Sequence, residues 1–223
     1  MKQFKIRCSA IGQIMTEPRS KTATLSQTTI TYLETWYKEQ LYNRRHRIDT
    51  KEMLRGTLSE AEAIEFAAKH FGWGMVFKNE QYFEDNELTG TPDIILPDMV
   101  ADIKCPWSCF TFPLFGREID KNYWWQLQGY MALTNRSQGL LVYTLMDMPE
   151  ELMDRELYYA AKRYDMIELE PEQEAEVRAE LTYSNLPDSL RIKPFQIARD
   201  DAAINRIRER VALCREYLRG IEV

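Results

Sequence analysis

The hydrophobic period of the chain changes from helical to strand-like after residue 74, and this change restricts the fold more than any other feature. Before it, residues 57–71 carry apolar side chains at the spacing of one buried helix face, and Gly72 and Gly74 end the helix. After it come strand-like segments joined by short polar turns, at 75–83, 89–96 and 100–105. A helix followed by such a meander predicts an α+β protein.

The remaining segments surround these strands with helices. Residues 8–16 read as a short helix that begins near Ser9, a favourable N-cap residue. The apolar spacing predicts further helices at 28–42, 121–133, 171–182 and 200–219, and a buried strand at 139–145. With 223 residues and no internal repeat, the chain is predicted to form a single domain, 1–223, with a mixed central sheet flanked by helices.

Composition is that of an ordinary globular protein, with 44% hydrophobic and 29% charged residues. No stretch approaches the roughly 20 apolar residues of a membrane helix, and the start lacks the apolar core of a signal peptide. We therefore expect a cytoplasmic protein without membrane contact. The cysteines are scattered and form no CxxC pair, which predicts reduced thiols; an iron–sulfur site at Cys105 and Cys109 is the alternative.

The net charge of −6 argues against a protein that coats nucleic acid non-specifically, because neutralising phosphates requires a basic surface. An acidic chain can still hold nucleic acid if its basic residues line one groove. The run Arg44-Arg45-His46-Arg47, with Arg191, Lys193 and Arg199, is a candidate lining, and a solvated surface position is the alternative for each residue.

Asp102 and Lys104 lie two residues apart in the apolar segment 100–105, so both point to the same side of the predicted strand. Burying an aspartate and a lysine is costly unless they pair or bind an ion. An ion pair at a sheet edge and an active site are both compatible with this strand alone.

Asp93 favours the active site. It begins an apolar run on the preceding strand, and a hairpin of this length brings it next to Asp102. Two adjacent carboxylates repel each other unless a hard cation lies between them, and Mg²⁺ takes ligands from one or two carboxylates, water and phosphate. Glu60 is a third candidate, in register with the apolar helix face at Ile64 and Phe71. A first-turn glutamate stabilised by the helix dipole is the alternative for Glu60.

These positions, taken with their neighbours, resemble the motifs of the PD-(D/E)XK nucleases and, more closely, of the lambda exonuclease/YqaJ viral recombinase family. The resemblance extends over about residues 6–134. Its order is more specific than any one motif: Ser9, Pro18-Arg19-Ser20, Gly56-Thr57-Leu58-Ser59-Glu60, Thr91-Pro92-Asp93, Asp102-Ile103-Lys104-Cys105-Pro106 and Gln126-Leu127-Gln128. It implies a restriction-endonuclease-like core, with a mixed central sheet flanked by helices.

The resemblance also implies a metal site and catalytic roles. Asp93, Asp102 and the backbone carbonyl of Ile103 would bind Mg²⁺ or Mn²⁺, and Glu60 would complete the metal site. Lys104 would orient or activate the attacking water. Either Gln126 or Gln128 would hold the nucleophile or the nearby phosphate, and a short local alignment favours Gln128. The lambda member of the family has glutamate at the position of Asp102, a substitution that the wider superfamily tolerates.

For DNA, the resemblance implies that Ser9 lies at a pocket for the terminal 5′ phosphate and that Arg19 reaches into the duplex. The arginine that the family places upstream of Ser9 has two candidates in this chain, Lys2 and Arg7. The aromatic cluster Trp107, Phe110, Phe112 and Phe115 reads as core or subunit contact rather than as a wedge between bases. The isolated His46 and His70 are assigned no role.

The function implied is a magnesium-dependent exonuclease that digests the 5′ strand of double-stranded DNA ends and leaves 3′ overhangs. It would work in phage or prophage recombination, hence in the cytoplasm of a bacterial host, with a single-strand annealing protein as partner. A ring-shaped homo-oligomer, expected to be a trimer, would enclose the duplex.

Two alternatives remain. One is another nuclease of the superfamily, either a structure-selective endonuclease or a Cas4-like protein, which needs a carboxy-terminal cysteine group where this chain has only Cys214. The other is a non-catalytic DNA-end-binding scaffold. An intact set of Glu60, Asp93, Asp102 and Lys104 disfavours the scaffold, since a binding module has no need of all four.

Overall fold

The centre of the protein is a four-stranded mixed sheet. The computed structural model, which describes residues 2–47 and 50–221, builds it from β4 (Ile94–Ile95), β5 (Met99–Lys104), β6 (Gln138–Thr144) and β7 (Ile192–Ala198), in that order. β5 and β6 are parallel, whereas β4 and β7 pair antiparallel at the two edges. The predicted α+β class with a mixed sheet is confirmed.

Helices cover both faces of this sheet. On one face α3 (Lys51–Phe71) packs against Ala101 and Ile103 of β5. On the other, α4 (Lys121–Thr134) packs against Val100. Because successive strand residues point to opposite faces, Asp102 shares the α4 side with Val100.

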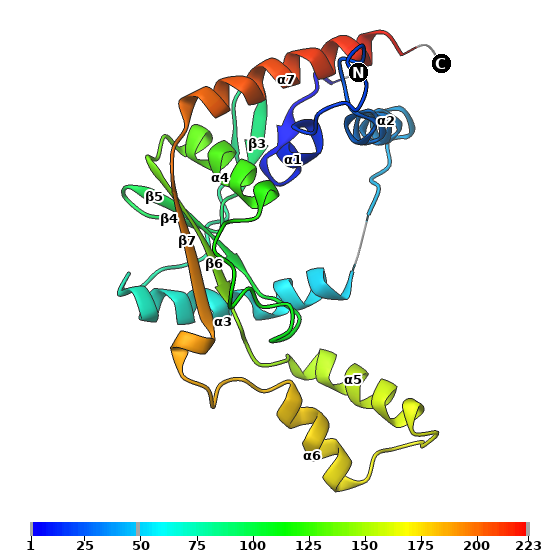
Figure 1. Ribbon diagram of the computed structural model, residues 1–223, viewed down its shortest axis with the longest axis vertical. Helices are drawn as coiled ribbons and strands as arrows, with labels where there is room; N and C mark the ends of the chain where they lie inside the picture. The colour runs from blue at the N-terminus through cyan, green and yellow to red at the C-terminus, as the bar shows by residue number, and fades with distance from the viewer. Residues whose placement is uncertain (1, 48–49, 222–223) are drawn as a thin grey trace.

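The remaining helices of the core lie on the α4 side (Figure 1). They are the 3₁₀ turn η1 (Cys8–Ala10), α1 (Ile11–Ile14), α2 (Gln27–Tyr42) and α7 (Asp201–Arg219). The η1 turn packs tightly on α4: a Cβ added at Gly129 would lie 2.8 Å from Cys8 Sγ and 2.6 Å from Ile11 Cδ1. Glycine at this position therefore lets the amino-terminal segment approach the helix.

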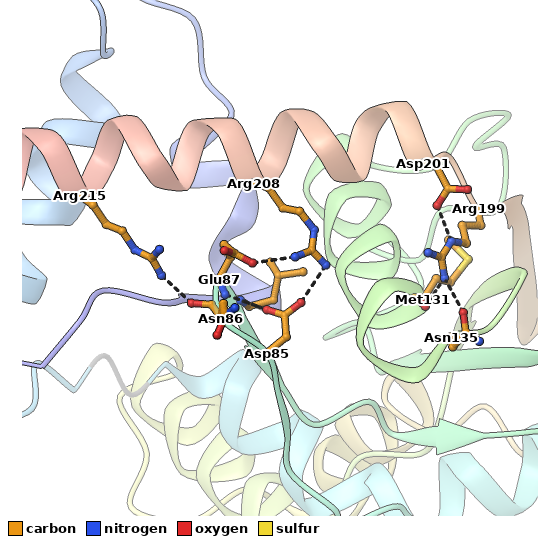
Figure 2. A network of polar contacts seen from close by, with 10 residues as sticks. Asp85, Asn86, Glu87, Met131, Asn135, Arg199, Asp201, Arg208 and Arg215 are labelled. Carbon is orange, nitrogen blue, oxygen red and sulfur yellow. Dashed lines mark hydrogen bonds and ion pairs between the residues drawn. The ribbon is translucent and has the colours of Figure 1, made fainter.

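A second, three-stranded sheet is attached to the core by α7. It consists of β1 (Ile6–Arg7), β3 (Leu88–Gly90) and β2 (Phe83–Glu84), in that order. Figure 2 shows how arginines of α7 hold its β2–β3 turn. Arg208 pairs with Asp85 at 2.9 Å and with Glu87 at 2.6 Å, and Arg215 donates to the carbonyl oxygen of Asn86 at 2.5 Å.

An antiparallel helical pair is inserted between β6 and β7 and projects away from the central sheet (Figure 1). It consists of α5 (Glu150–Arg163) and α6 (Pro171–Glu180), and the short 3₁₀ turn η2 (Asp188–Leu190) leads from it into β7. Proline at the first position of α6 confirms the predicted start of that helix. Across residues 2–47 and 50–221, no helix combines the length and the apolarity needed to span a membrane.

The helices predicted from apolar spacing are confirmed, with shifted ends. The helix predicted at 57–71 begins earlier, at Lys51, because Thr50 caps it by accepting a hydrogen bond from the Met53 N–H at 3.2 Å. Ser9 is not the N-cap that its residue type suggested: it lies inside η1 and makes no capping hydrogen bond. Helix α5 and strand β7 were not predicted; β7 contains Pro194, which weakens a strand pattern and is tolerated here on an edge strand.

The predicted three-stranded meander is wrong. Only Phe83 of the segment 75–83 belongs to a strand, and the segment 89–96 divides between β3 and β4, which lie in different sheets. Pro92 has no N–H to donate to a ladder. Asn79 bonds the backbone there instead, donating through Nδ2 to Pro92 O at 2.9 Å and through its N–H to Asp93 O at 2.7 Å. The chain therefore leaves one sheet and enters the other at this point.

Candidate active site

Strand β5 places Asp102 and Lys104 together on the α4 side of the sheet. Asp102 is 1% exposed, and its Oδ2 lies 2.5 Å from Lys104 Nζ. Among the described residues, Lys104 is the one partner of Oδ2, because no other donor forms a hydrogen bond with it. A buried carboxylate needs compensating charge, and an oxygen that meets a single cation keeps an acceptor site for another. The Asp–Lys ion pair is thus present, and its carboxylate retains an acceptor site for a second cation.

Gln126 of α4 fixes the other oxygen of this carboxylate. Its Nε2 donates to Asp102 Oδ1 at 2.9 Å and also contacts Tyr130 Oη at 3.1 Å. Gln126 and Tyr130 are four residues apart, so they lie on the same helix face. Tyr130 was missed by sequence reasoning, and its only signal there is this spacing from the glutamine. The contact holds Asp102 in one orientation.

The preference for Gln128 is not supported by the contacts of that residue. Its Nε2 donates to Ala198 O at 2.9 Å, and its Oε1 accepts from the Asp200 N–H at 2.8 Å. The side chain is fully buried and spans the junction between β7 and α7. Gln128 therefore joins α4 to the β7–α7 junction and stabilises the fold. Gln126 is the glutamine that contacts the candidate site.

Asp93 joins the same group from the start of β4. Its Oδ2 accepts a hydrogen bond from the Ile103 N–H at 2.8 Å, so the expected closeness to the Asp102 strand is confirmed. Burial and the neighbouring Asp102 raise the pKa of Asp93 to about 7, against the opposing effects of Lys104 and of that hydrogen bond. For Lys104, burial lowers the pKa, but Asp102 and Asp93 outweigh it and the net shift is upward. Asp93 and Asp102 therefore share the positive charge of Lys104.

These residues fit a hard divalent cation. Within residues 2–47 and 50–221 there is no cluster of three or more His, Cys, Asp or Glu side chains arranged to hold a metal. Mg²⁺ does not require one, because it commonly uses one or two carboxylates with water and phosphate. Asp102 Oδ2 has only Lys104 as a partner among the described residues, so it can accept such a cation. The cation would also oppose the effects of burial and of the neighbouring Asp102, which raise the pKa of Asp93. Of the predicted ligands, Asp93, Asp102 and the Ile103 backbone come together.

Glu60 lies on α3 and is engaged elsewhere. Its Oε2 pairs with Lys78 Nζ at 2.6 Å, a partner that the sequence did not indicate. It is near enough to Asp93 to contribute to the raised pKa of that residue, as the smallest of the causes. Its role in completing the metal site stays a prediction.

The predicted DNA-binding residues of the amino-terminal segment are all exposed: Lys2, Arg7, Ser9 and Arg19. Ser9 is in η1, the turn that packs on α4, the helix of Gln126. This packing connects the proposed phosphate pocket to the site through one helix. The role of each of these residues in binding a 5′ phosphate or the duplex stays a prediction.

The predicted basic lining is only partly available. Arg191 is buried, stacks on Phe66 with its guanidinium carbon 4.6 Å from the ring centroid, and donates to Leu145 O at 3.3 Å. Arg199 pairs with Asp201 at 2.7 Å and donates to Met131 O at 3.1 Å (Figure 2). Both arginines stabilise the fold. The run 44–47 is exposed, and Lys193 is only partly buried, so these remain candidates for a lining.

The residues of the predicted aromatic cluster differ in burial. Phe112 is buried, as the core interpretation predicts, but Phe110 and Phe115 are 95% and 91% exposed. Trp107 is partly buried, with Lys51 Nζ 4.3 Å from its ring centroid.

For the iron–sulfur alternative, Cys105 contacts Thr144 Oγ1 at 3.6 Å and Cys109 is exposed. Neither cysteine belongs to a metal-binding group within the described residues.

Several solved exonuclease structures have this fold. The phage-related exonuclease of Haemophilus somnus is 24% identical, with 97% of this chain and 94% of that chain covered and a TM-score of 0.78. The alkaline exonuclease LHK-Exo of Laribacter hongkongensis is 19% identical, over 97% of this chain and 88% of that chain, with a TM-score of 0.66. The structure of its complex with dAMP is 21% identical, over 97% of this chain and 88% of that chain, with a TM-score of 0.65. No family model and no curated protein matches the chain. The nuclease fold implied by the sequence resemblance is confirmed.

Proposed function

We propose that the protein is a divalent-metal-dependent exonuclease that digests the 5′ strand of double-stranded DNA ends and leaves 3′ overhangs. The observation that carries this proposal is the buried group of Asp93, Asp102 and Lys104, in which two carboxylates share one lysine. It is supported by a fold shared with a phage-related exonuclease and an alkaline exonuclease, the latter also solved with dAMP. A binding scaffold needs no such arrangement of charges.

Each residue of the candidate site has its own part in the proposed hydrolysis. Asp93, Asp102 and the Ile103 carbonyl oxygen would hold Mg²⁺ or Mn²⁺. When bound, the cation supplies polarisation of the phosphate and a more acidic attacking water. Lys104 presents a positive charge beside the carboxylates and stabilises the negative charge that develops on the phosphate. Gln126 holds Oδ1 of Asp102, which leaves Oδ2 for Lys104 and the cation.

The proposal includes a role in recombination, with a partner protein and an oligomeric form. In the cytoplasm of a bacterial host, the 3′ overhang would be taken up by a single-strand annealing protein. A ring-shaped homo-oligomer, a trimer in our proposal, would let an acidic chain hold DNA by directing its basic residues into a channel. Of the basic residues proposed above as a lining, the exposed run 44–47 and the partly buried Lys193 would line this channel.

The proposal is tested with linear duplex DNA labelled on either the 5′ or the 3′ end of one strand, in Mg²⁺ and in EDTA. We expect Mg²⁺-dependent loss of the 5′ strand, and no degradation of closed circles. Cutting of closed circles would assign an endonuclease on the same fold. The absence of metal-dependent cutting on every substrate would refute the enzymatic assignment and leave the DNA-end-binding scaffold.

The two glutamines of α4 give a matched pair of variants. Gln126→Leu removes the support of Asp102 Oδ1, so the degradation rate should fall about 10-fold to 100-fold and more Mg²⁺ should be needed for half-maximal activity. Gln128→Leu removes two backbone contacts between α4 and the β7–α7 junction, so it should lower the Tm. Activity titrated with Mg²⁺, together with thermal unfolding, separates the two effects. Equal Mg²⁺ requirements in Gln126→Leu and the wild type would contradict the assignment of Gln126.

A further inference from the structure

A cleft lies between α5 and the start of α3, apart from the carboxylates. It has a volume of about 480 Å³, and its lining comes mainly from α5, with Lys51 and Trp107 on the other side. This volume is within the range of small-ligand sites, roughly 300–1,000 Å³.

One stripe of α5 forms the wall of this cleft. Arg155, Tyr159 and Arg163 line it at intervals of four residues, which puts them on one helix face. Lys162 adds a further cation beside them. The stripe alternates positive charge with an aromatic ring.

The cleft has an excess of positive charge in an acidic protein. Its lining includes Lys51, Arg155, Lys162 and Arg163, against the single carboxylate of Glu156. None of these four cations forms an ion pair with another described residue, and all four are exposed. In a chain of net charge −6, such a concentration of unpaired cations favours an anionic ligand.

Arg55 adds a buried charge on the Trp107 side of the cleft. It is fully buried, its guanidinium carbon lies 5.8 Å from the Trp107 ring centroid, and its Nε has no hydrogen-bond partner among the described residues. Its donors reach Met146 O at 2.6 Å and Met148 Sδ at 3.0 Å, and no carboxylate among the described residues pairs with it. A buried cation without a carboxylate partner is costly, and an anion in the adjacent cleft reduces that cost.

Two aromatic rings face the cleft. Tyr159 is 52% exposed, and Trp107 lies on the opposite side beneath Lys51. Alternating cations and exposed rings are what a single strand of nucleic acid requires, because phosphates contact the cations and unpaired bases stack on the rings. The bases of a duplex are already stacked and offer no faces to such rings.

We infer that this cleft binds single-stranded DNA, with phosphates on Arg155, Arg163 and Lys51 and a base against Tyr159. Trp107 follows Lys104 by three residues, so a short segment joins this side of the cleft to the strand that carries Asp102 and Lys104. The inference rests on the proposed function for its ligand, because digestion of one strand of a duplex end leaves the other strand unpaired. It assigns a task to α5, the helix inserted between the two last strands of the sheet.

The test is the binding of a fluorescein-labelled oligothymidylate of about 12 nucleotides, followed by anisotropy in EDTA so that no cutting occurs. The variants are the double Arg155→Gln/Arg163→Gln and the single Tyr159→Leu. The charge-matched control is Lys69→Gln/Arg219→Gln, at exposed positions on α3 and α7. Tyr82→Leu is the control for Tyr159, since Tyr82 is similarly exposed at 59% but lies outside the cleft lining. Thermal unfolding verifies that each variant folds.

We expect the double cleft variant to raise the Kd about tenfold or more and to lower the slope of log K against log salt by about 1.4, because each single-strand phosphate contact contributes about 0.7. Tyr159→Leu should raise the Kd about fivefold or more, with both controls near the wild type. Unchanged binding in the cleft variants, or no binding by the wild type, would overturn the inference. So would a labelled oligoglutamate peptide that binds in a cleft-dependent way when oligothymidylate does not.

Degradation of labelled duplex DNA by the wild type, measured in parallel, separates the two proposals. Strand binding that depends on the cleft, without any degradation, would refute the nuclease and leave the cleft assignment. Degradation together with cleft-independent binding would refute the cleft assignment and leave the nuclease.

Discussion

Replacing Lys104 by alanine should reduce the rate of Mg²⁺-dependent DNA degradation by about 10²-fold to 10³-fold. The expected loss is that of one charged group aimed at the phosphate in a partly buried site. The same variant leaves Asp102 buried without its ion-pair partner, because Oδ2 has no hydrogen bond to replace it. We therefore also expect a lower Tm in EDTA, with Mg²⁺ restoring a larger part of the Tm than it adds to the wild type.

Lys78→Ala is the matched control for this variant. Lys78 is also a lysine paired with a carboxylate, at 2.6 Å from Glu60, but it is exposed. Exposed pairs contribute little, so its Tm should change by less than that of Lys104→Ala. Degradation by Lys104→Ala at the wild-type rate, measured on the same labelled duplex, would exclude Lys104 from the reaction.

The candidate site could be predicted largely because its charges interrupt an apolar pattern. Asp102 and Lys104 stand out on β5, since every other side chain of that strand suits a core. The two glutamines could not be separated in this way. Gln126 and Gln128 lie about 200° apart around a helix whose carboxy-terminal part is buried on all sides, so apolar spacing does not say which one faces the sheet. The structure decides this through their hydrogen-bond partners.

Basic residues were a weaker guide than acidic ones. Arginine is used both for phosphate binding and for capping backbone carbonyls, and the sequence does not distinguish these uses. Arg191 and Arg199 were predicted as groove lining but bond backbone oxygens of the fold. Conversely, the cations of α5 attracted no prediction because the helix itself was not recognised. The positions of free cations depend on which carboxylates and carbonyls the fold brings near them.

The fold prediction failed where a short polar contact redirects the chain. Apolar spacing located the helices, yet the segment 89–96 was read as one strand although Pro92 divides it. The resulting turn is also what places Asp93 at the start of β4, beside β5. The turn at Pro92, which made the strand prediction wrong, therefore also positions Asp93 in the candidate site.

Asp93→Asn should stabilise the protein in EDTA while abolishing its response to Mg²⁺. The pKa of Asp93 is about 7 in the folded protein, against an ordinary value of 3.8, so ionisation is opposed by the fold. A raised carboxyl pKa contributes stability below the unfolded value that is lost as pH rises through the folded value. The Tm of the wild type should therefore fall relative to Asp93→Asn between about pH 4 and pH 7, and the variant should be a few degrees more stable at pH 8.

Mg²⁺ should reverse this order at pH 8. It binds the folded wild type through Asp93 and Asp102, so it raises the wild-type Tm by mass action, whereas asparagine provides no charge to hold it. Because the asparagine oxygen can still accept from the Ile103 N–H, the local backbone is preserved and a loss of response cannot be attributed to unfolding. Thermal unfolding at several pH values, with EDTA and with Mg²⁺, measures both effects. A variant that is less stable than the wild type in EDTA at pH 8, or that Mg²⁺ stabilises equally, would show that Asp93 is a structural carboxylate and that the metal lies elsewhere.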